Sequence, residues 1–291
     1  MNLKKCMLTA NRCYQQNKRI TNRKPTGIVV HSTGANNKTL KRYVQPLKTD
    51  KDYNTIIADI GKNLYGNHWN RSAVSTCVHA FIGTNKAGAV ETYQNLPWDI
   101  CCWGVGSGKN GSYNYNPTAR IQFEICEDNK KDKDYFNSAF KEAIELCAYL
   151  CEKYSISVDK ICSHSEAYKA GYGSNHGDPE HWMKNFGKDM TWFRAEVQKL
   201  LDASKKHTAQ KYTGTFPTLP SRGYFKNGDS GTQVKNLQKF LNWCVSSNLT
   251  VDGIIGAKTI SAVKVFQNRY GLKVDGLFGS SSLAKAKTVT K

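Results

Sequence analysis

Cys162-Ser163-His164-Ser165-Glu166, followed by His176-Gly177-Asp178-Pro179, is the stretch that brings two kinds of metal-binding side chain close together along the chain. A further candidate ligand, His31, ends the apolar run Gly27-Ile28-Val29-Val30 far upstream. Two imidazoles and one carboxylate can hold a zinc ion and leave a fourth position open for water. Such an arrangement is typical of a hydrolytic site rather than of a closed structural one.

Strand-like and helix-like signals alternate around this stretch, over residues 27–201. The apolar segment 77–82 and the segment 89–93, separated by a Gly-containing turn, predict a hairpin. Residues 121–125 alternate apolar and polar side chains, which predicts a half-buried strand. A helical repeat of apolar residues follows over 136–151, and a short strand over 158–162 leads into His164. Residues 1–201 are therefore expected to form an α/β domain with a mixed central β-sheet flanked by helices.

The composition changes after Leu201. Residues 202–222 are polar and turn-rich, which predicts a linker. Residues 223–291 are expected to form a small helical domain with an internal echo, because Val251-Asp252-Gly253-Ile254-Ile255-Gly256 is repeated as Val274-Asp275-Gly276-Leu277-Phe278-Gly279. Asp-Gly sets a tight turn in each copy, and the second Gly precedes a residue that can start a helix.

Charge and composition bound the possible partners of this chain. The formal net charge of +19 favours a polyanion, either nucleic acid or the anionic polymers of a bacterial wall. The basic residues are spread along the chain and form no basic helix or recognisable nucleic-acid module, so a nucleic-acid partner is not expected. No apolar run approaches the roughly 20 residues that span a membrane, so no membrane insertion is expected either.

The N-terminus and the cysteines indicate where the chain is made. Met1–Thr9 is basic, but Asn11 and Arg12 interrupt any secretory apolar segment. We therefore expect synthesis in the cytoplasm without a signal peptide. The 10 cysteines include no CxxC pair, which excludes a zinc ribbon, and most are expected to be reduced, buried, small apolar residues.

Five segments in a fixed order carry a family resemblance. They are Ile28-Val29-Val30-His31-Ser32-Thr33, Val78-His79-Ala80-Phe81-Ile82-Gly83, Ile121-Gln122-Phe123-Glu124-Ile125, Cys162-Ser163-His164 and His176-Gly177-Asp178-Pro179. With them, residues 27 to about 200 resemble the zinc-dependent N-acetylmuramoyl-L-alanine amidases of the type 2 family, whose fold is shared with peptidoglycan-recognition proteins. The region from Gly223 to about Lys287 is similar to the peptidoglycan-binding type 1 module, through its two Val-Asp-Gly motifs.

The resemblance implies roles for individual residues. The family's zinc ligands fall on His31, His164 and Asp178, and its catalytic glutamate falls on Glu124, which would act as general base on zinc-activated water. His176 stands where the family commonly has a lysine close to the reacting carbonyl, and a histidine there could donate a hydrogen bond to a developing oxyanion. The expected reaction is hydrolysis of the amide bond between N-acetylmuramic acid and L-alanine of the stem peptide.

Three further positions qualify this resemblance. His79 matches a histidine of the second strand, for which a core or outer role around the ligands is expected rather than ligation. Trp103-Gly104 stands where many members have Trp-His, so the contribution of that histidine is missing. Cys162 lies two residues before His164 and is a less favoured alternative to Asp178 as the third metal ligand.

The implied biological role is that of a phage or prophage endolysin, which acts on the bacterial cell wall after release by a membrane-permeabilising partner. A bacterial autolysin exported by another route remains an alternative. A non-catalytic peptidoglycan-recognition protein and a zinc peptidase that cuts within the stem peptide are the biochemical alternatives. The host, the preferred wall chemistry and the oligomeric state stay open.

Overall fold

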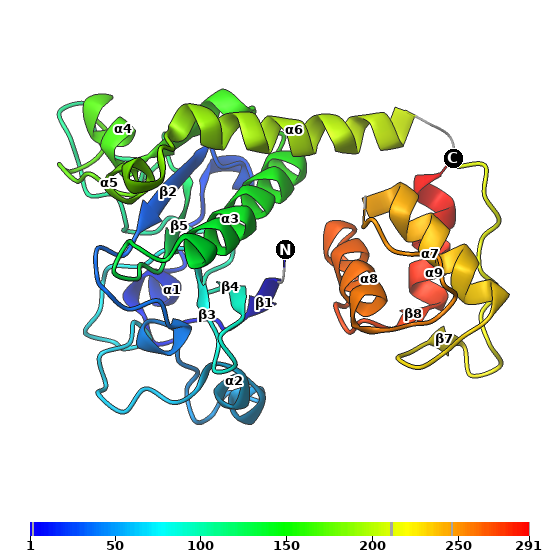
Figure 1. The fold of residues 1–291 in the computed structure, drawn as a ribbon. Helices are drawn as coiled ribbons and strands as arrows, with labels where there is room; N and C mark the ends of the chain where they lie inside the picture. Colours follow the sequence, from blue (N-terminus) through cyan, green and yellow to red (C-terminus); the bar gives the residue numbers. More distant parts are fainter. Residues whose placement is uncertain (2, 210–211, 246, 291) are drawn as a thin grey trace. The chain divides into compact units, whose positions relative to one another are not determined.

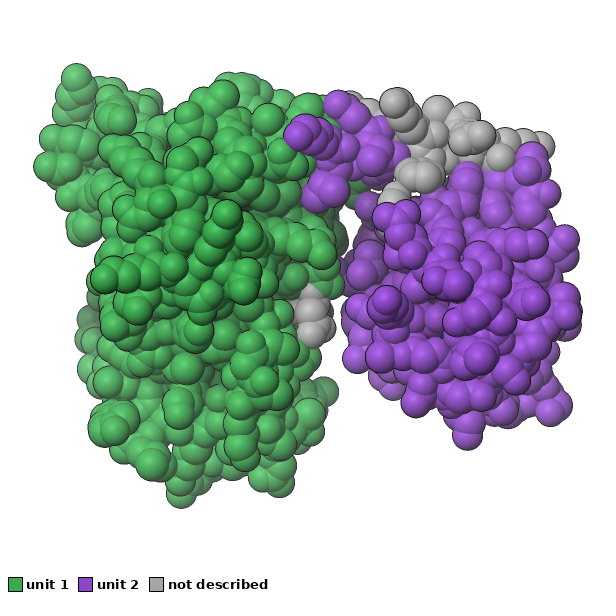
Figure 2. Space-filling model, in the orientation of Figure 1, with its two compact units in different colours: residues 1, 3–198 green, residues 2, 199–291 purple. Residues whose placement is uncertain are grey.

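The computed structural model describes residues 1, 3–209, 212–245 and 247–290. The chain forms two compact units, one made of residue 1 and residues 3–198 and the other beginning at Lys199 (Figure 2). The first unit is a mixed α/β structure and the second is mainly helical (Figure 1). Both features confirm the fold class that the sequence predicts.

A six-stranded sheet forms the centre of the first unit (Figure 1). Its strands lie in the order β1 (Leu3–Lys5), β4 (Val90–Gln94), β3 (Ala80–Thr84), β5 (Ile121–Ile125), β2 (Ile28–Ser32) and β6 (Ile161–Ser163). Neighbouring strands run parallel except β3 and β4, which form the predicted antiparallel hairpin. The sheet is therefore mixed but mostly parallel.

The two central strands, β2 and β5, are buried on both faces. All five residues of β2 are buried, and only Glu124 of β5 is half-exposed. The prediction of a half-buried strand at 121–125 is therefore wrong, because neighbouring strands and covering segments enclose both faces, as is usual in parallel sheets. Its alternation nevertheless places Gln122 and Glu124 on the face opposite Ile121, Phe123 and Ile125.

The first unit also contains helices. They are α1 (Arg12–Gln16), α2 (Tyr53–Ile60), α3 (Lys133–Tyr154), α4 (His164–Lys169), α5 (Glu180–Met183) and α6 (Met190–Ala209), whose last residues belong to the second unit. Among them, α3 and α4 pack against the sheet. The long helix α3 packs against β3, β4 and β5 (Figure 1). Asp132 caps its N-terminus by accepting a hydrogen bond from the backbone N–H of Tyr135 at 2.9 Å, whereas Asp134 lies in the first turn.

The N-terminal segment belongs to the first unit. Strand β1 pairs with β4 at one edge of the sheet. The Lys4 ammonium lies 2.7 Å from Asp59 Oδ2 and 2.8 Å from Glu91 Oε2. Leu8 and Cys13 are buried in a common cluster. These contacts settle a point that the sequence leaves open, since residues before β2 pack on the α/β domain.

Two segments differ from their predicted structure. Residues 158–160 form a 3-10 turn, and only Ile161–Ser163 form a strand. The predicted linker at 202–222 begins as helix, because α6 continues to Ala209. Tyr212, Phe216 and Leu219 also pack against the core of the second unit. The segment that connects the two units is therefore shorter than the linker that composition alone predicts.

Beyond α6, the described residues of the second unit form helices and a short strand pair. They are α7 (Thr232–Val245), α8 (Ala257–Arg269), α9 (Ser280–Val289), β7 (Tyr224–Phe225) and β8 (Phe278–Gly279). Helices α8 and α9 each begin directly after the second glycine of one echo motif, Gly256 or Gly279. The sequence echo thus corresponds to a repeated turn followed by a helix.

A buried glutamine holds each repeated turn. Gln238 accepts a hydrogen bond from the Gly253 N–H at 2.8 Å and donates to Asp252 Oδ1 at 2.7 Å. Gln267 makes the equivalent bonds to the Gly276 N–H and Asp275 Oδ1, both at 2.8 Å. Gly253 and Gly276 have φ of +82° and +77°, which favours glycine over residues with a Cβ.

All ten cysteines are free thiols, and every one except Cys162 is buried. This agrees with their predicted role as small core residues. Over the described ranges, none of the helices combines the length and the apolar character needed to cross a membrane.

Candidate metal centre

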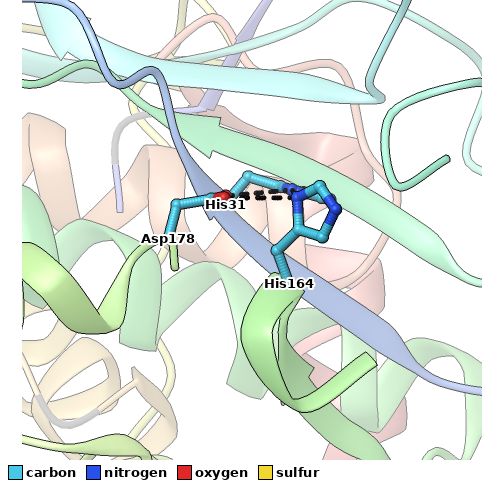
Figure 3. Close-up of side chains that lie close together, drawn as sticks. All are labelled: His31, His164 and Asp178. Carbon is cyan, nitrogen blue, oxygen red and sulfur yellow. Dashed lines mark hydrogen bonds and ion pairs between the residues drawn. The ribbon is translucent and has the colours of Figure 1, made fainter. Parts of the chain in front are cut away.

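The three predicted ligands meet in one place, although they come from distant parts of the chain (Figure 3). His31 lies in β2, His164 is the first residue of α4, and Asp178 lies in the loop before α5. His31 Nδ1 is 3.1 Å from His164 Nδ1 and 3.2 Å from Asp178 Oδ2, and His164 Nδ1 is 3.2 Å from Asp178 Oδ1. The two Nδ1 atoms and the Asp178 carboxylate therefore converge on a common centre, where one ligand atom from each residue lies within 4.8 Å of the other two.

A capping box formed by Ser163 and Glu166 determines where the helix that carries His164 begins. Ser163 accepts a hydrogen bond from the Glu166 N–H at 2.9 Å, and Glu166 accepts one from the Ser163 N–H at 3.1 Å. Arg194 of α6 holds Glu166 through two bonds of 2.8 and 3.0 Å. Helix α4 is therefore forced to begin at His164, directly after β6, which directs its imidazole toward β2.

Hydrogen bonds hold the loop that contains Asp178 against both α4 and β2. The Asp178 carbonyl accepts a hydrogen bond from the His164 N–H at 3.1 Å, and its carboxylate accepts one from the Ser32 N–H at 3.3 Å. Just beyond the loop, Trp182 of α5 is fully buried against Phe136 and Phe140 of α3. This packing keeps the carboxylate over His164.

A fully buried carboxylate, Glu127, connects α5, the helix that follows this loop, to β2. Ser32 Oγ donates to Glu127 Oε1 at 2.6 Å, and His181 Nε2 lies 3.0 Å from the same oxygen. Burial alone would raise the pKa of Glu127, but the hydrogen bonds from His181 and Ser32 outweigh it and lower that pKa. The same contact with Glu127 raises the pKa of His181.

The remaining ring nitrogens of the two histidines have their own partners. His31 Nε2 lies 3.2 Å from Gln122 Oε1, and His164 Nε2 lies 3.2 Å from Ser174 Oγ. Such outer partners let the Nδ1 atoms serve as ligands. Burial would raise the pKa of Asp178, but the hydrogen bonds from His164 and His31 lower it well below its usual range. The carboxylate is therefore ionised.

This donor set fits a zinc ion in both geometry and chemistry. Ligands at about 2.0–2.1 Å from a tetrahedral zinc lie roughly 3.3 Å from one another. The two Nδ1 atoms, 3.1 Å apart, match that spacing, and each also lies 3.2 Å from a carboxylate oxygen of Asp178, Oδ2 for His31 and Oδ1 for His164. Nitrogen and carboxylate ligands in this combination suit zinc and leave a fourth position for water or substrate.

Glu124 lies beside the three ligands, on the strand next to His31. The two residues are paired in the parallel register of β2 and β5, so their side chains leave the same face of the sheet. Glu124 Oε2 is buried and has no hydrogen-bond partner within the described part of the chain. Burial, followed by the charges of Asp178 and Glu127, raises the pKa of Glu124 well above its usual value.

His176 lies at the exposed side of the centre. Its ring centroid is 4.6 Å from that of His164. Its Nδ1 lies 3.0 Å from Ser174 Oγ, the same oxygen that faces His164 Nε2. Ser174 therefore connects the imidazoles of a candidate ligand and the candidate oxyanion donor.

Two other residues from the sequence patterns lie outside the cluster. His79 is fully buried, its Nδ1 accepts the Gln122 N–H at 3.0 Å, and its Nε2 donates to the Ile100 carbonyl at 2.8 Å. Burial lowers the pKa of His79 to about 4. Cys162 faces Arg120 Nη1 at 3.2 Å instead of the three ligands.

Sequence reasoning missed Gln122, Ser174 and Glu127. Gln122 shares its strand face with Glu124, so a polar residue two positions before the glutamate was an available signal. Ser174 and Glu127 lie in loops, where spacing alone does not report which side chain they touch. Their contacts come from the tertiary structure.

The fold and this centre together define a class: an α/β protein whose central strands and adjoining loops bring a His-His-Asp cluster and a buried carboxylate side by side. A family model described as N-acetylmuramoyl-L-alanine amidase matches residues 21–181, more than half of the chain. The chain belongs to this family. A second model, for a peptidoglycan binding domain, matches residues 230–285 within the helical unit.

Individual relatives carry the same family name. The chain is 31% identical over 171 residues to N-acetylmuramoyl-L-alanine amidase CwlL of Bacillus licheniformis, a match that covers 57% of this chain and 44% of that protein. It is 29% identical over 220 residues to N-acetylmuramoyl-L-alanine amidase CwlA of Bacillus subtilis strain 168, covering 69% of this chain and 77% of the relative. The chain thus spans less than half the length of the first relative.

Among solved structures, the hydrolase AmiA of Staphylococcus aureus in complex with its ligand overlaps with a TM-score of 0.48 at 17% identity. The overlap covers 71% of this chain and 86% of that one. Similarity at this level adds nothing to the family assignment.

Proposed function

We propose that this protein is a zinc-dependent N-acetylmuramoyl-L-alanine amidase, with His31, His164 and Asp178 as the zinc ligands. Its reaction is hydrolysis of the amide bond that joins the lactyl group of N-acetylmuramic acid to L-alanine. The observation that carries the proposal is the convergence of two imidazole nitrogens, 3.1 Å apart, with the Asp178 carboxylate, which lies 3.2 Å from each. Beside them lies the buried Oε2 of Glu124, which has no hydrogen-bond partner among the described residues. Family membership over residues 21–181 supports the same reaction.

The roles of the residues follow from their chemistry. A zinc ion bound at this centre supplies Lewis-acid polarisation of the amide carbonyl and lowers the pKa of water. Glu124 accepts a proton from the attacking water, whose oxygen forms the new bond to the lactyl carbonyl carbon. Glu124 then delivers that proton to the amide nitrogen as the C–N bond breaks, which releases the amino group of L-alanine.

His176 serves in this proposal as a donor to the oxyanion that forms on the substrate carbonyl. Ser174 Oγ lies 3.0 Å from His176 Nδ1, and in this proposal its hydroxyl donates to that nitrogen, so that Nε2 carries the proton donated to the substrate. We expect His176→Ala to lower kcat by about 10²–10³, the usual cost of losing one oxyanion donor, with little change in KM or zinc content.

His176→Lys is the matched variant for this prediction. A lysine ammonium also donates a hydrogen bond and has an ordinary pKa of about 10.4, so we expect it to recover most of the lost kcat. Steady-state kinetics on purified walls, with zinc content measured on the same samples, checks both variants. Unchanged kcat in His176→Ala would remove His176 from the mechanism.

The helical unit serves, in this proposal, to hold the enzyme on its insoluble substrate. Support comes from the peptidoglycan-binding family model at residues 230–285. The net charge of +19 favours additional attraction to anionic wall polymers. We further propose that the protein acts on the bacterial cell wall as a phage or prophage endolysin, with an autolysin as the alternative.

Mass spectrometry of digested walls tests the proposed reaction. Purified protein should release stem peptides with a new free amino group on L-alanine and leave intact glycan strands, and a chelator should stop the release. A new terminus elsewhere in the stem peptide would identify a peptidase. Binding of muropeptides without any new terminus would identify a recognition protein and overturn the proposal.

A further inference from the structure

We propose that Gln122 is a positioning residue that fixes the tautomer of His31, so that His31 carries its proton on Nε2 and presents Nδ1 to the metal centre. This inference rests on the proposed function, since it concerns the same centre. It assigns a role to a side chain that neither ligates nor reacts. The geometry around Gln122 supplies the argument.

The orientation of the Gln122 amide follows from a chain of hydrogen bonds that begins at the backbone. Asn114 Oδ1 accepts the N–H groups of Gly104 and Val105, both at 3.1 Å, so this atom is the amide oxygen. Gln122 Nε2 donates to the same oxygen at 2.9 Å. The other amide atom, Gln122 Oε1, is therefore the one that faces His31 Nε2 at 3.2 Å.

A carbonyl oxygen can only accept, so the His31 nitrogen that faces it must carry the proton. The reversed amide would place its oxygen against Asn114 Oδ1 and its NH₂ group against His31. With the proton on Nε2, the lone pair of His31 lies on Nδ1, 3.1 Å from His164 Nδ1 and 3.2 Å from Asp178 Oδ2. Without a metal, the Asp178 carboxylate competes for a proton on this same nitrogen, so Gln122 acts on the metal-bound form, in which Nδ1 would be the ligand atom and Nε2 would carry the proton.

Burial makes this arrangement rigid. Gln122 is 0% exposed, Asn114 4% and His31 1%. The Gln122 backbone N–H is also held, because it donates to His79 Nδ1 at 3.0 Å. No bulk water is available to replace any of these bonds, so loss of one partner leaves the next one unsatisfied.

Gly104 provides the space that the Gln122 amide occupies. A Cβ at position 104 would lie 2.6 Å from Gln122 Oε1 and 2.8 Å from a methyl carbon of Val78. Any larger residue at 104 would therefore push the amide away from His31. The glycine and the glutamine form a matched pair that together defines the orientation of the imidazole.

Nitrogen NMR of the full-length, zinc-loaded protein tests the inference directly, and we expect His31 to carry a proton on Nε2 and the metal on Nδ1. Gln122→Leu keeps the volume of the side chain but removes the acceptor. Its zinc affinity, measured by competition with a chelating dye, should fall about 10–100-fold, as is usual when an outer partner of a ligand is lost.

A further variant serves as the control. Gln238→Leu removes an equally buried glutamine from the second unit (1% exposed) and should leave zinc affinity and the His31 tautomer unchanged.

Two results would overturn the inference: protonation of His31 on Nδ1 in the zinc-loaded, unsubstituted protein, or unchanged zinc affinity in a folded Gln122→Leu variant. The NMR measurement on the unsubstituted protein decides the matter even if Gln122→Leu fails to fold. Absence of zinc binding by the unsubstituted protein would refute the proposed function instead.

Discussion

Glu124→Gln should reduce wall hydrolysis by about 10²–10⁴-fold, the usual contribution of a general acid–base residue, while zinc content stays the same. The substitution preserves the shape of the side chain but removes its capacity to accept a proton. Glu124 is not a candidate ligand, and its Oε2 makes no hydrogen bond that the amide would break within the described structure. Release of L-alanine amino groups and the zinc-to-protein ratio, measured together, check this result.

Glu91→Gln is the matched control for this experiment. Glu91 is a buried carboxylate on β4 of the same sheet, but it contacts Lys4 at 2.8 Å and lies outside the candidate centre. We expect this variant to lose some stability and to keep its hydrolytic rate per folded molecule. Full activity in Glu124→Gln, or an equal loss in both variants, would exclude Glu124 as the base.

The pH dependence of hydrolysis should follow from the same carboxyl group. Burial and the nearby charges of Asp178 and Glu127 raise the pKa of Glu124, so the active, ionised form is lost as pH falls through that raised value. A cation held by the three ligands favours the ionised form and moves this limit to lower pH. The hydrolytic rate should therefore rise as pH increases from the acid side. The residual rate of Glu124→Gln should not show this rise.

Asp178→Asn is expected to have the second large effect, through the metal itself. The substitution removes the one anionic ligand and leaves two imidazoles, so zinc affinity should fall by more than the roughly 10–100-fold typical of an outer partner. A ligand present at about 1,000 times its Kd stabilises the folded state by about 4 kcal/mol. A chelator should therefore lower the Tm of the original protein and leave the Tm of Asp178→Asn nearly unchanged.

Cys162→Ala provides the control for the ligand assignment. Cys162 is a soft potential ligand only two residues from His164, but its Sγ faces Arg120, and burial raises the pKa of its thiol to about 11. We expect the variant to keep both its zinc and the chelator-induced shift in Tm. Loss of zinc in Cys162→Ala, or its retention in Asp178→Asn, would contradict the assignment of Asp178.

Much of the candidate centre could be predicted from short patterns in the sequence. Period-two alternation places Glu124 on the face opposite Phe123, and the register with β2 places that face beside His31. The Ser163-to-Glu166 spacing contains the capping box that starts α4 at His164, although only the structure revealed its use. Local geometry of strands and helix ends depends on nearby residues, which is why such patterns are informative.

Other features could not be predicted in this way. The segment 202–222 is polar in composition, which predicts a linker. In the structure, α6 extends to Ala209 and Tyr212 packs on the helical unit. The strand at 121–125 alternates like a half-exposed strand but is covered on both faces. Whether a strand face is buried depends on which other segments pack on it. Neither the alternation of apolar residues nor the composition of a segment reports that packing.

The sequence by itself determined the residue types available for chemistry, the order of the elements, and the turns at Gly253 and Gly276 that recur with each Asp-Gly pair. Only the tertiary structure decided that His31, His164 and Asp178 share one centre, that Gln122 contacts the first of them, and that Glu127 joins α5 to β2. The physical reason is range: helix caps, alternation and turns are set by residues a few positions apart. Metal geometry and buried hydrogen bonds join segments separated by more than a hundred residues, so they exist only once the sheet has brought those segments together.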